Sequence, residues 1–268
     1  MLTPETITSA ANPLLKEVRR TAARGGLSAD GWCIAESFHL LEEALRSRRR
    51  VRAVLAAESK RAAAEPLAAR LDAGKFLLLP DALFDAIAST ENSQGAMALV
   101  EPAEWKLQDL FRGKPLLMIL DGIQDPGNAG TIVRAAEAFG ASGVLFLKGA
   151  VSPHNPKTLR ASAGSLFRVP FQHGVAAATA LATLRQNGVR VFAAMPSGAG
   201  TPEQALAATD FTARCALVVG NEAHGVSEEW RDAAAGVTIP TVGVESLNAA
   251  MAAVILLYEA RRQRMIEP

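Results

Sequence analysis

Residues 116–143, LLMILDGIQDPGNAGTIVRAAEAFGASG, contain the pattern that decides the fold class. The apolar run 116–120 ends at Asp121, which predicts a buried parallel strand. After a polar turn, apolar residues recur at helical spacing. A helix is therefore expected to begin at Asn128, whose side-chain oxygen can cap it, and to end at Gly140. A polar loop between such a strand and helix is where open α/β sheets bind their ligands.

The chain has 268 residues, of which 49% are hydrophobic, and a formal net charge of +1. This length predicts one large or two ordinary domains, and the charge alone indicates no nucleic-acid partner, so any such binding must come from local patches. Cys33 and Cys215 lie far apart in apolar, strand-like runs, which favours reduced, buried thiols over a disulfide or a metal site. With no signal-peptide core and no apolar helix long enough to cross a bilayer, we expect a soluble, cytoplasmic protein.

Residues 1–100 alternate short apolar and helical segments, which predicts a small α/β domain with mainly parallel strands. The expected helices are 14–24 (opened by Asn12-Pro13 and stopped by Gly25-Gly26), 37–45 (capped by Ser37), 60–72 and 81–88, and the expected strands are 32–35, 51–56, 76–79 and 96–100. Arginines gather in the first helix, which contains Arg19 and Arg20, and in a turn that contains Arg49. Such clusters are usually a solvated face, but two of them in so small a unit could equally bind phosphates.

Residues 101–114 combine a proline, a tryptophan and several charges without periodicity, and we expect them to link this domain to a second one, residues 115–268. There the alternation resumes around a polar loop at 152–170. The expected strands are 144–147, 189–194, 216–219 and 237–239, and the expected helices are 176–187, 228–235 and a last one that begins near Ser246. The last helix has an apolar stripe made of Leu247, Met251, Val254, Ile255 and Tyr258.

Three loops follow apolar strands in this second domain: 122–130, 220–227 and 240–245. In a parallel sheet all three open at the same edge and can converge on one pocket. The polar residues in or beside them are Asn128, Arg134, Asn221, Glu222, Ser246 and Asn248. Any one of these could simply cap a helix or face solvent. Their occurrence in three glycine-rich loops together favours a ligand site, because glycine lets the backbone approach a ligand closely.

Three motifs stand in order along the second domain: Asn128-Ala-Gly-Thr-Ile-Val-Arg134, Val219-Gly-Asn-Glu-Ala-His-Gly225, and Ile239-Pro240 followed by Gly243 and Ser246-Leu247-Asn248. They resemble the motifs of the SpoU (TrmH-like) branch of the SPOUT RNA methyltransferases. Segments 156–167 and 90–95 are similar to further stretches of that family, so the resemblance covers essentially the whole chain. Ala223 and the run 249–252 depart from the family pattern, and we expect them to tune packing rather than to abolish activity.

The resemblance implies a fold and a reaction. Residues 115–268 would form a parallel-sheet domain with a deep trefoil knot, and residues 1–100 an RNA substrate-binding domain. Two chains would form a homodimer through the knotted domain and the terminal helix. The implied reaction transfers a methyl group from S-adenosylmethionine to a ribose 2′-hydroxyl of RNA, without a metal. Ribosomal RNA is the first expectation for the substrate and transfer RNA the second.

The resemblance also implies roles for particular residues. The catalytic residues would be Arg134, Asn128, Glu222, Ser246 and Asn248; Gly220, Ile239, Leu247 and Met195 would hold the cofactor; and Lys157, Arg160, Arg168, Arg19, Arg20 and Arg49 would bind RNA. Arg134 could act as the base or as an electrostatic stabiliser that grips the phosphate beside the target ribose. Because a guanidinium is effectively never deprotonated in proteins, the second role is the one we favour.

Two other classes of function compete with this interpretation. A nicotinamide or flavin enzyme would use the same sheet-edge pocket, but the turn after Asp121 lacks the G-x-G-x-x-G pattern that a pyrophosphate site needs. A non-catalytic RNA-binding factor for ribosome assembly could share the scaffold. The presence of Asn128, Arg134, Glu222 and Asn248 together disfavours that alternative.

Overall fold

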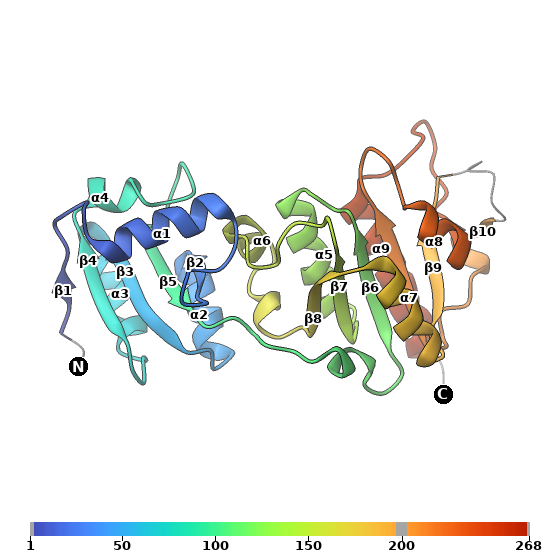
Figure 1. The fold of residues 1–268 in the computed structure, drawn as a ribbon, viewed down its shortest axis with the longest axis horizontal. Coiled ribbons are helices and arrows are strands. Elements are labelled where there is room, and N and C mark those ends of the chain that lie inside the picture. The colour runs from blue at the N-terminus through green and yellow to red at the C-terminus, as the bar shows by residue number, and fades with distance from the viewer. Residues whose placement is uncertain (1–2, 197–202, 267–268) are drawn as a thin grey trace. The chain divides into compact units, whose positions relative to one another are not determined.

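The structure, a computed structural model, describes residues 3–196 and 203–266 and divides into two compact units (Figure 1). The first unit runs to Glu104 and includes Ser152–Arg168, and the second comprises Trp105–Val151 and the chain from Val169 onward. The first change of unit falls inside residues 101–114, where a linker is expected. The return of residues 152–168 to the first unit is a feature that the sequence does not suggest.

The first unit is built on a five-stranded sheet in the order β1-β4-β3-β5-β2. Its strands are β1 (Glu5–Thr6), β2 (Cys33–Glu36), β3 (Val51–Ala57), β4 (Lys75–Leu79) and β5 (Ala96–Val100). The sheet is mixed: β1, β4, β3 and β2 run in the same direction, in line with the predicted mainly parallel strands, and the antiparallel strand is β5. The preceding helix, α4 (Asp81–Asp85), has five residues. It rises only about 7 Å, less than half the length of a five-residue strand, and therefore does not carry the chain back along the sheet.

The helices of the first unit begin where their capping residues predict. Asn12 caps α1 (Pro13–Arg24) by accepting the N–H of Leu14, and Gly25 ends it at a φ of 68°. Ser37 caps α2 (Phe38–Arg46) by accepting the N–H of Leu40. Both predicted caps are confirmed. The helix expected at 60–72 is shorter, with a 3₁₀ turn (Glu58–Lys60) and then α3 (Arg61–Ala68).

Residues 152–168 are not the polar loop that the sequence suggests. They contain α6 (Pro156–Ala161) and a 3₁₀ turn (Ser165–Phe167). The side chains of Thr158, Ser162 and Ser165 are buried. Because polar residues occupy these interior positions, the apolar period that normally reveals a helix is absent.

The second unit contains a seven-stranded parallel sheet in the order β10-β12-β9-β11-β6-β7-β8. The strands are β6 (Leu116–Asp121), β7 (Gly143–Leu147), β8 (Phe171–Val175), β9 (Arg190–Ala194), β10 (Glu203–Ala205), β11 (Cys215–Gly220) and β12 (Ala235–Thr238). The α/β class and the central strands are confirmed, whereas β8 and β10 are not anticipated. β6 and β11 are neighbours, with Gly220 opposite Asp121. The loops that follow these two strands therefore open at the same edge.

Helices α5 (Pro126–Ala138), α7 (Ala177–Gln186), α8 (Glu228–Ala233) and α9 (Ala249–Ile266) connect or follow these strands, and two 3₁₀ turns (Leu107–Phe111 and Leu206–Ala208) complete the unit. α5 begins earlier than predicted, because Asp125 caps it by accepting the N–H of Asn128. Asn128 is thus inside the first turn rather than at the cap, which leaves its own side chain available for other bonds. Gly140 follows the helix end at a φ of 73°, as expected.

The face of α9 that packs inward differs from the predicted apolar stripe. The buried side chains include Ala253, Leu256 and Leu257, whereas Met251 and Tyr258 are 61% and 55% exposed. The helix packs on α5 and β11 through the face that contains these buried alanine and leucine side chains. Met251 and Tyr258 of the predicted stripe are outside that face.

One side chain near the end of α9 makes several bonds to the segments that precede β6 and β11. The Arg264 guanidinium donates to the carbonyl oxygens of Lys114, Pro115, Phe211 and Ala213 and to the Cys215 sulfur, at 2.6–3.3 Å.

Both cysteines are buried and reduced, as predicted. Burial raises the pKa of the Cys33 thiol to about 12 and also raises the pKa of Cys215. Within residues 3–196 and 203–266, no helix is long and apolar enough to cross a membrane, and no three His, Cys, Asp or Glu side chains are grouped so as to hold a metal.

Candidate active site

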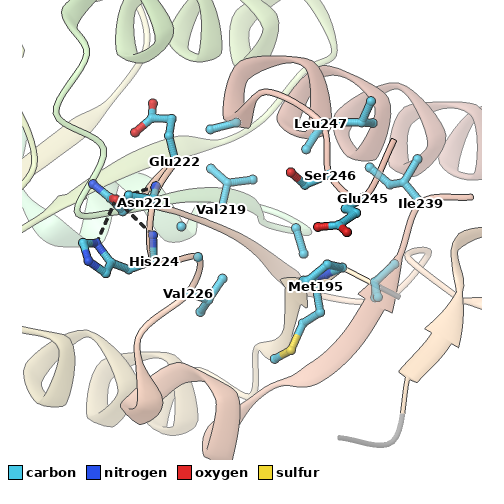
Figure 2. Close-up of a pocket in the computed structure, with 18 of the residues that line it drawn as sticks. Met195, Val219, Asn221, Glu222, His224, Val226, Ile239, Glu245, Ser246 and Leu247 are labelled. Carbon is cyan, nitrogen blue, oxygen red and sulfur yellow. Dashed lines mark hydrogen bonds between the residues drawn. The ribbon is translucent and has the colours of Figure 1, made fainter. Parts of the chain in front are cut away.

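A pocket of about 490 Å³ lies at the carboxyl ends of β9, β11 and β12 (Figure 2). All four residues expected to hold a cofactor line it: Met195, Gly220, Ile239 and Leu247. Two of the expected catalytic residues, Glu222 and Ser246, line it as well. Residues 197–202, which follow closely after Met195 in the chain, lie outside the described residues.

Gly220 is required by the packing of the backbone in this pocket. A Cβ atom at this position would lie 2.1 Å from the carbonyl carbon of Gly225 and 2.2 Å from the nitrogen of Val226. Neither atom belongs to a side chain that could turn away. The chain can therefore fold back on itself at 220–226 only because residue 220 has no side chain.

Asn221 builds the loop that follows β11. Its Nδ2 donates to the carbonyl oxygen of Gly122 at 2.9 Å, and its Oδ1 accepts the N–H of Ala223 at 2.9 Å. Nearby, the Asp121 carboxylate accepts the N–H of Ser227 at 2.7 Å. These bonds join the loops after β6 and β11. Asn221 is among the polar loop residues that the sequence singles out, without a specific role, whereas Asp121 is not among them. The position of Asp121 directly at the end of its strand is the signal that could have identified it.

Three residues from three separate motifs form one hydrogen-bonded chain. Asn128 Nδ2 donates to Glu222 Oε1 at 2.6 Å, and Asn128 Oδ1 accepts from Asn248 Nδ2 at 3.1 Å. Asn248 Oδ1 in turn accepts the N–H groups of Ala250 and Met251 in the first turn of α9. An ionised carboxylate only accepts, so Glu222 fixes which way each amide points.

Arg134 and Ser246 complete the predicted catalytic set. Arg134 lies on the exposed side of α5, six residues after Asn128, and its side chain makes no hydrogen bond or ion pair with any other described residue. Ser246 is exposed at the pocket between Glu245 and Leu247 (Figure 2). The structure thus brings Asn128, Glu222 and Asn248 together by direct bonds, and places Ser246 in the pocket that Glu222 also lines.

The six residues expected to bind RNA all lie in the first unit. Arg160 pairs with the buried Glu36 at 3.5 Å, and Arg168 pairs with the buried Glu43 at 2.5 Å. Glu36 also accepts hydrogen bonds from Ser89 and from the Thr90 hydroxyl. Among the others, Lys157 and Arg20 are exposed, whereas Arg19 and Arg49 are half-buried.

The chain matches two family models. Residues 115–258 match the SpoU rRNA methylase family, and residues 36–106 match the family described as RNA 2′-O ribose methyltransferase substrate binding. It is 31% identical to the 23S rRNA (guanosine(2553)-2′-O)-methyltransferase RlmP of Bacillus subtilis over 95% of this chain and 98% of that protein.

Two solved structures are also similar. The AdoMet-bound rRNA methyltransferase from Sinorhizobium meliloti has a TM-score of 0.79 at 27% identity, covering 96% of this chain and 97% of that one. The TrmH/SpoU tRNA modifying enzyme of A. aeolicus has a TM-score of 0.51 at 29% identity, and the match covers 59% of this chain and 81% of that one.

Proposed function

The chain belongs to the SpoU rRNA methylase family and is an RNA 2′-O-ribose methyltransferase that uses S-adenosylmethionine, and we propose that its substrate is ribosomal RNA. One observation supports this substrate most. The ribosomal RNA enzymes of Bacillus and Sinorhizobium match 95% or more of the chain, whereas the tRNA modifying enzyme matches 59% of it. Both units of the chain, rather than the second alone, are thus shared with ribosomal enzymes.

The pocket fits S-adenosylmethionine. Its volume of about 490 Å³ is within the usual range for small-molecule sites. Val219, Ile239 and Leu247 offer apolar surface to an adenine ring, and Gly220 exposes backbone. Glu222 and Glu245 place carboxylates where a positively charged sulfonium compound would bind. When bound, the cofactor supplies an electrophilic methyl group on a sulfonium sulfur.

The chain's own residues would position the ribose hydroxyl and stabilise the charge that develops on it. We propose that Arg134 binds the phosphate beside the target ribose and stabilises the negative charge that develops on the ribose oxygen. Its guanidinium is exposed and has no partner in the described residues. The bonds of Asn128 would hold Glu222 in place, while Ser246 and Asn248 would order the rest of the site.

The homodimer and the trefoil knot stay predictions. The exposed apolar stripe on α9, with Met251 and Tyr258, supports the dimer because a surface of this kind is typical of an interface. Sedimentation of the purified protein tests it, and a monomer at micromolar concentration would contradict it. RNA contact by Arg160, Arg168, Arg19 and Arg49 also stays a prediction.

The experiment that tests the function is transfer of labelled methyl from S-adenosylmethionine to total unmodified RNA, separated by size. We expect label in large ribosomal RNA at ribose 2′-oxygens, with none for Arg134→Ala. Arg134→Lys keeps the charge but loses the two-pronged hydrogen bonding, so a large loss of turnover is expected. Label in transfer RNA would overturn the proposed substrate, and near-normal turnover of Arg134→Lys would overturn the role of Arg134.

A further inference from the structure

The cations of the first unit divide into two groups. Those held in ion pairs within the described residues include Arg46, Arg50, Arg52, Arg61, Lys75, Arg160 and Arg168. Lys16, Arg20, Arg24 and Lys157 are exposed, and their side chains make no hydrogen bond or ion pair with another described residue. The second group can bind an anion without breaking an existing pair.

Three of these free cations lie along one face of α1. Lys16, Arg20 and Arg24 are four residues apart, so they occupy one stripe with a spacing of about 6 Å along the helix axis. The opposite face packs inward through Leu15 and Val18.

The acidic charge of α1 does not neutralise this stripe. Its single acidic residue, Glu17, lies 4.0 Å from Arg52 and is only partly exposed. The outer face of α1 is therefore a row of unneutralised positive charge.

The fourth free cation, Lys157, lies on α6, which adjoins the end of α1. At the helix terminus, a Cβ atom on Gly25 would lie 2.6 Å from Nδ2 of Asn155, the residue that caps α6. Lys157 is exposed in the first turn of α6. Figure 1 shows the end of α1 beside α6 within the first unit. Arg24 and Lys157 thus lie on adjoining elements that the sequence separates by more than a hundred residues.

We propose that Lys16, Arg20, Arg24 and Lys157, the α1–α6 strip, bind the phosphodiester backbone of single-stranded RNA. The inference rests on the proposed function, since it names the surface that would hold the RNA substrate. Both α1 and α6 lie outside residues 36–106, the segment matched by the substrate-binding family. Evenly spaced cations suit the sugar-phosphate chain, and a 2′-hydroxyl is presented most readily by an unpaired strand.

The test compares two triple variants with equal charge changes. Lys16→Gln/Arg20→Gln/Arg24→Gln removes the α1 part of the strip, and Lys60→Gln/Arg61→Gln/Arg70→Gln removes three exposed cations around α3. Binding of a fluorescent, mixed-sequence, single-stranded RNA is measured by anisotropy over a range of salt concentrations. Because each phosphate contact on a single strand contributes about 0.7 to the slope of log K against log salt, the strip variant should lose about 2 from this slope. It should also lose affinity at low salt on the order of tenfold or more, and the control variant should resemble wild type.

Methyl transfer gives an independent measurement. The strip variant should raise KM for RNA and leave kcat and S-adenosylmethionine affinity unchanged, because these side chains hold substrate outside the reacting centre. Equal slopes of log K against log salt for the strip and control variants would refute RNA binding by the α1–α6 strip. If wild type binds RNA by the strip but methylates no ribosomal RNA, the proposed substrate fails while the strip stands.

Discussion

Replacing Asn128 with aspartate should damage the site more than removing the side chain altogether. In the native protein the Asn128 amide donates to Glu222 at 2.6 Å and accepts from Asn248 at 3.1 Å. An aspartate in its place could still accept from Asn248. Toward Glu222 it would present an oxygen instead of an N–H, so two carboxylates would face each other.

The magnitude follows from these two changes. A hydrogen bond to a charged group contributes about 1.5–3 kcal/mol. Two unit charges about 3 Å apart in a water-like medium repel each other by about 1.4 kcal/mol. The site is exposed, so rotation of a carboxylate into water limits the total. We expect kcat/KM to fall roughly tenfold for Asn128→Ala and on the order of 100-fold for Asn128→Asp.

A compensating change separates this explanation from a general loss of structure. In Asn128→Asp/Glu222→Gln, the new glutamine amide can donate to the introduced aspartate, and Asn248 keeps its acceptor. S-adenosylmethionine affinity, measured by calorimetry, should fall in Asn128→Asp and recover in part in the double variant, which lacks the Glu222 carboxylate, while the melting temperature changes little in either. If Asn128→Asp binds the cofactor and turns over as well as Asn128→Ala, the proposal that Asn128 acts as a hydrogen-bond donor to Glu222 is wrong.

Gly220→Ala should abolish cofactor binding, because its Cβ atom would lie 2.1 Å from backbone. Gly26→Ala is the control, because nothing lies within 4 Å of a Cβ atom there. Tight cofactor binding by Gly220→Ala in calorimetry would contradict the steric argument. Arg264→Ala should destabilise the fold by about 3–5 kcal/mol in urea unfolding, since four carbonyl oxygens lose their donor. Arg264→Lys should recover only part of this stability. A loss under about 1 kcal/mol for Arg264→Ala would show that water replaces the guanidinium. Because burial raises the pKa of Cys33 to about 12, its contribution to stability is complete below the thiol's unfolded pKa and is lost as pH rises toward 12. The free energy of unfolding should therefore fall more steeply above about pH 9 in wild type than in Cys33→Ala. Equal dependence of this free energy on pH in the two proteins would refute the raised pKa of Cys33.

Features that depend on neighbouring residues could be predicted from the sequence. Asn12 and Ser37 cap their helices as predicted, because a cap bonds to backbone only two or three residues away. The apolar runs locate the central parallel strands, and the end of each strand locates a loop of the pocket. The four residues expected to hold the cofactor follow from the family resemblance of the motifs, and all four line this pocket.

Features that depend on distant partners could not be predicted in this way. Asn128 bonds to residues 94 and 120 positions away in the chain, and Asp125 rather than Asn128 caps α5. Contacts with α5 and β11 settle which face of α9 is buried. The pairing of β5 with β3 settles the direction of β5. Arg160 and Arg168 pair with buried glutamates of a segment over a hundred residues earlier. Periodicity and capping describe a helix or strand in isolation, whereas these choices depend on side chains that only folding brings within bonding distance.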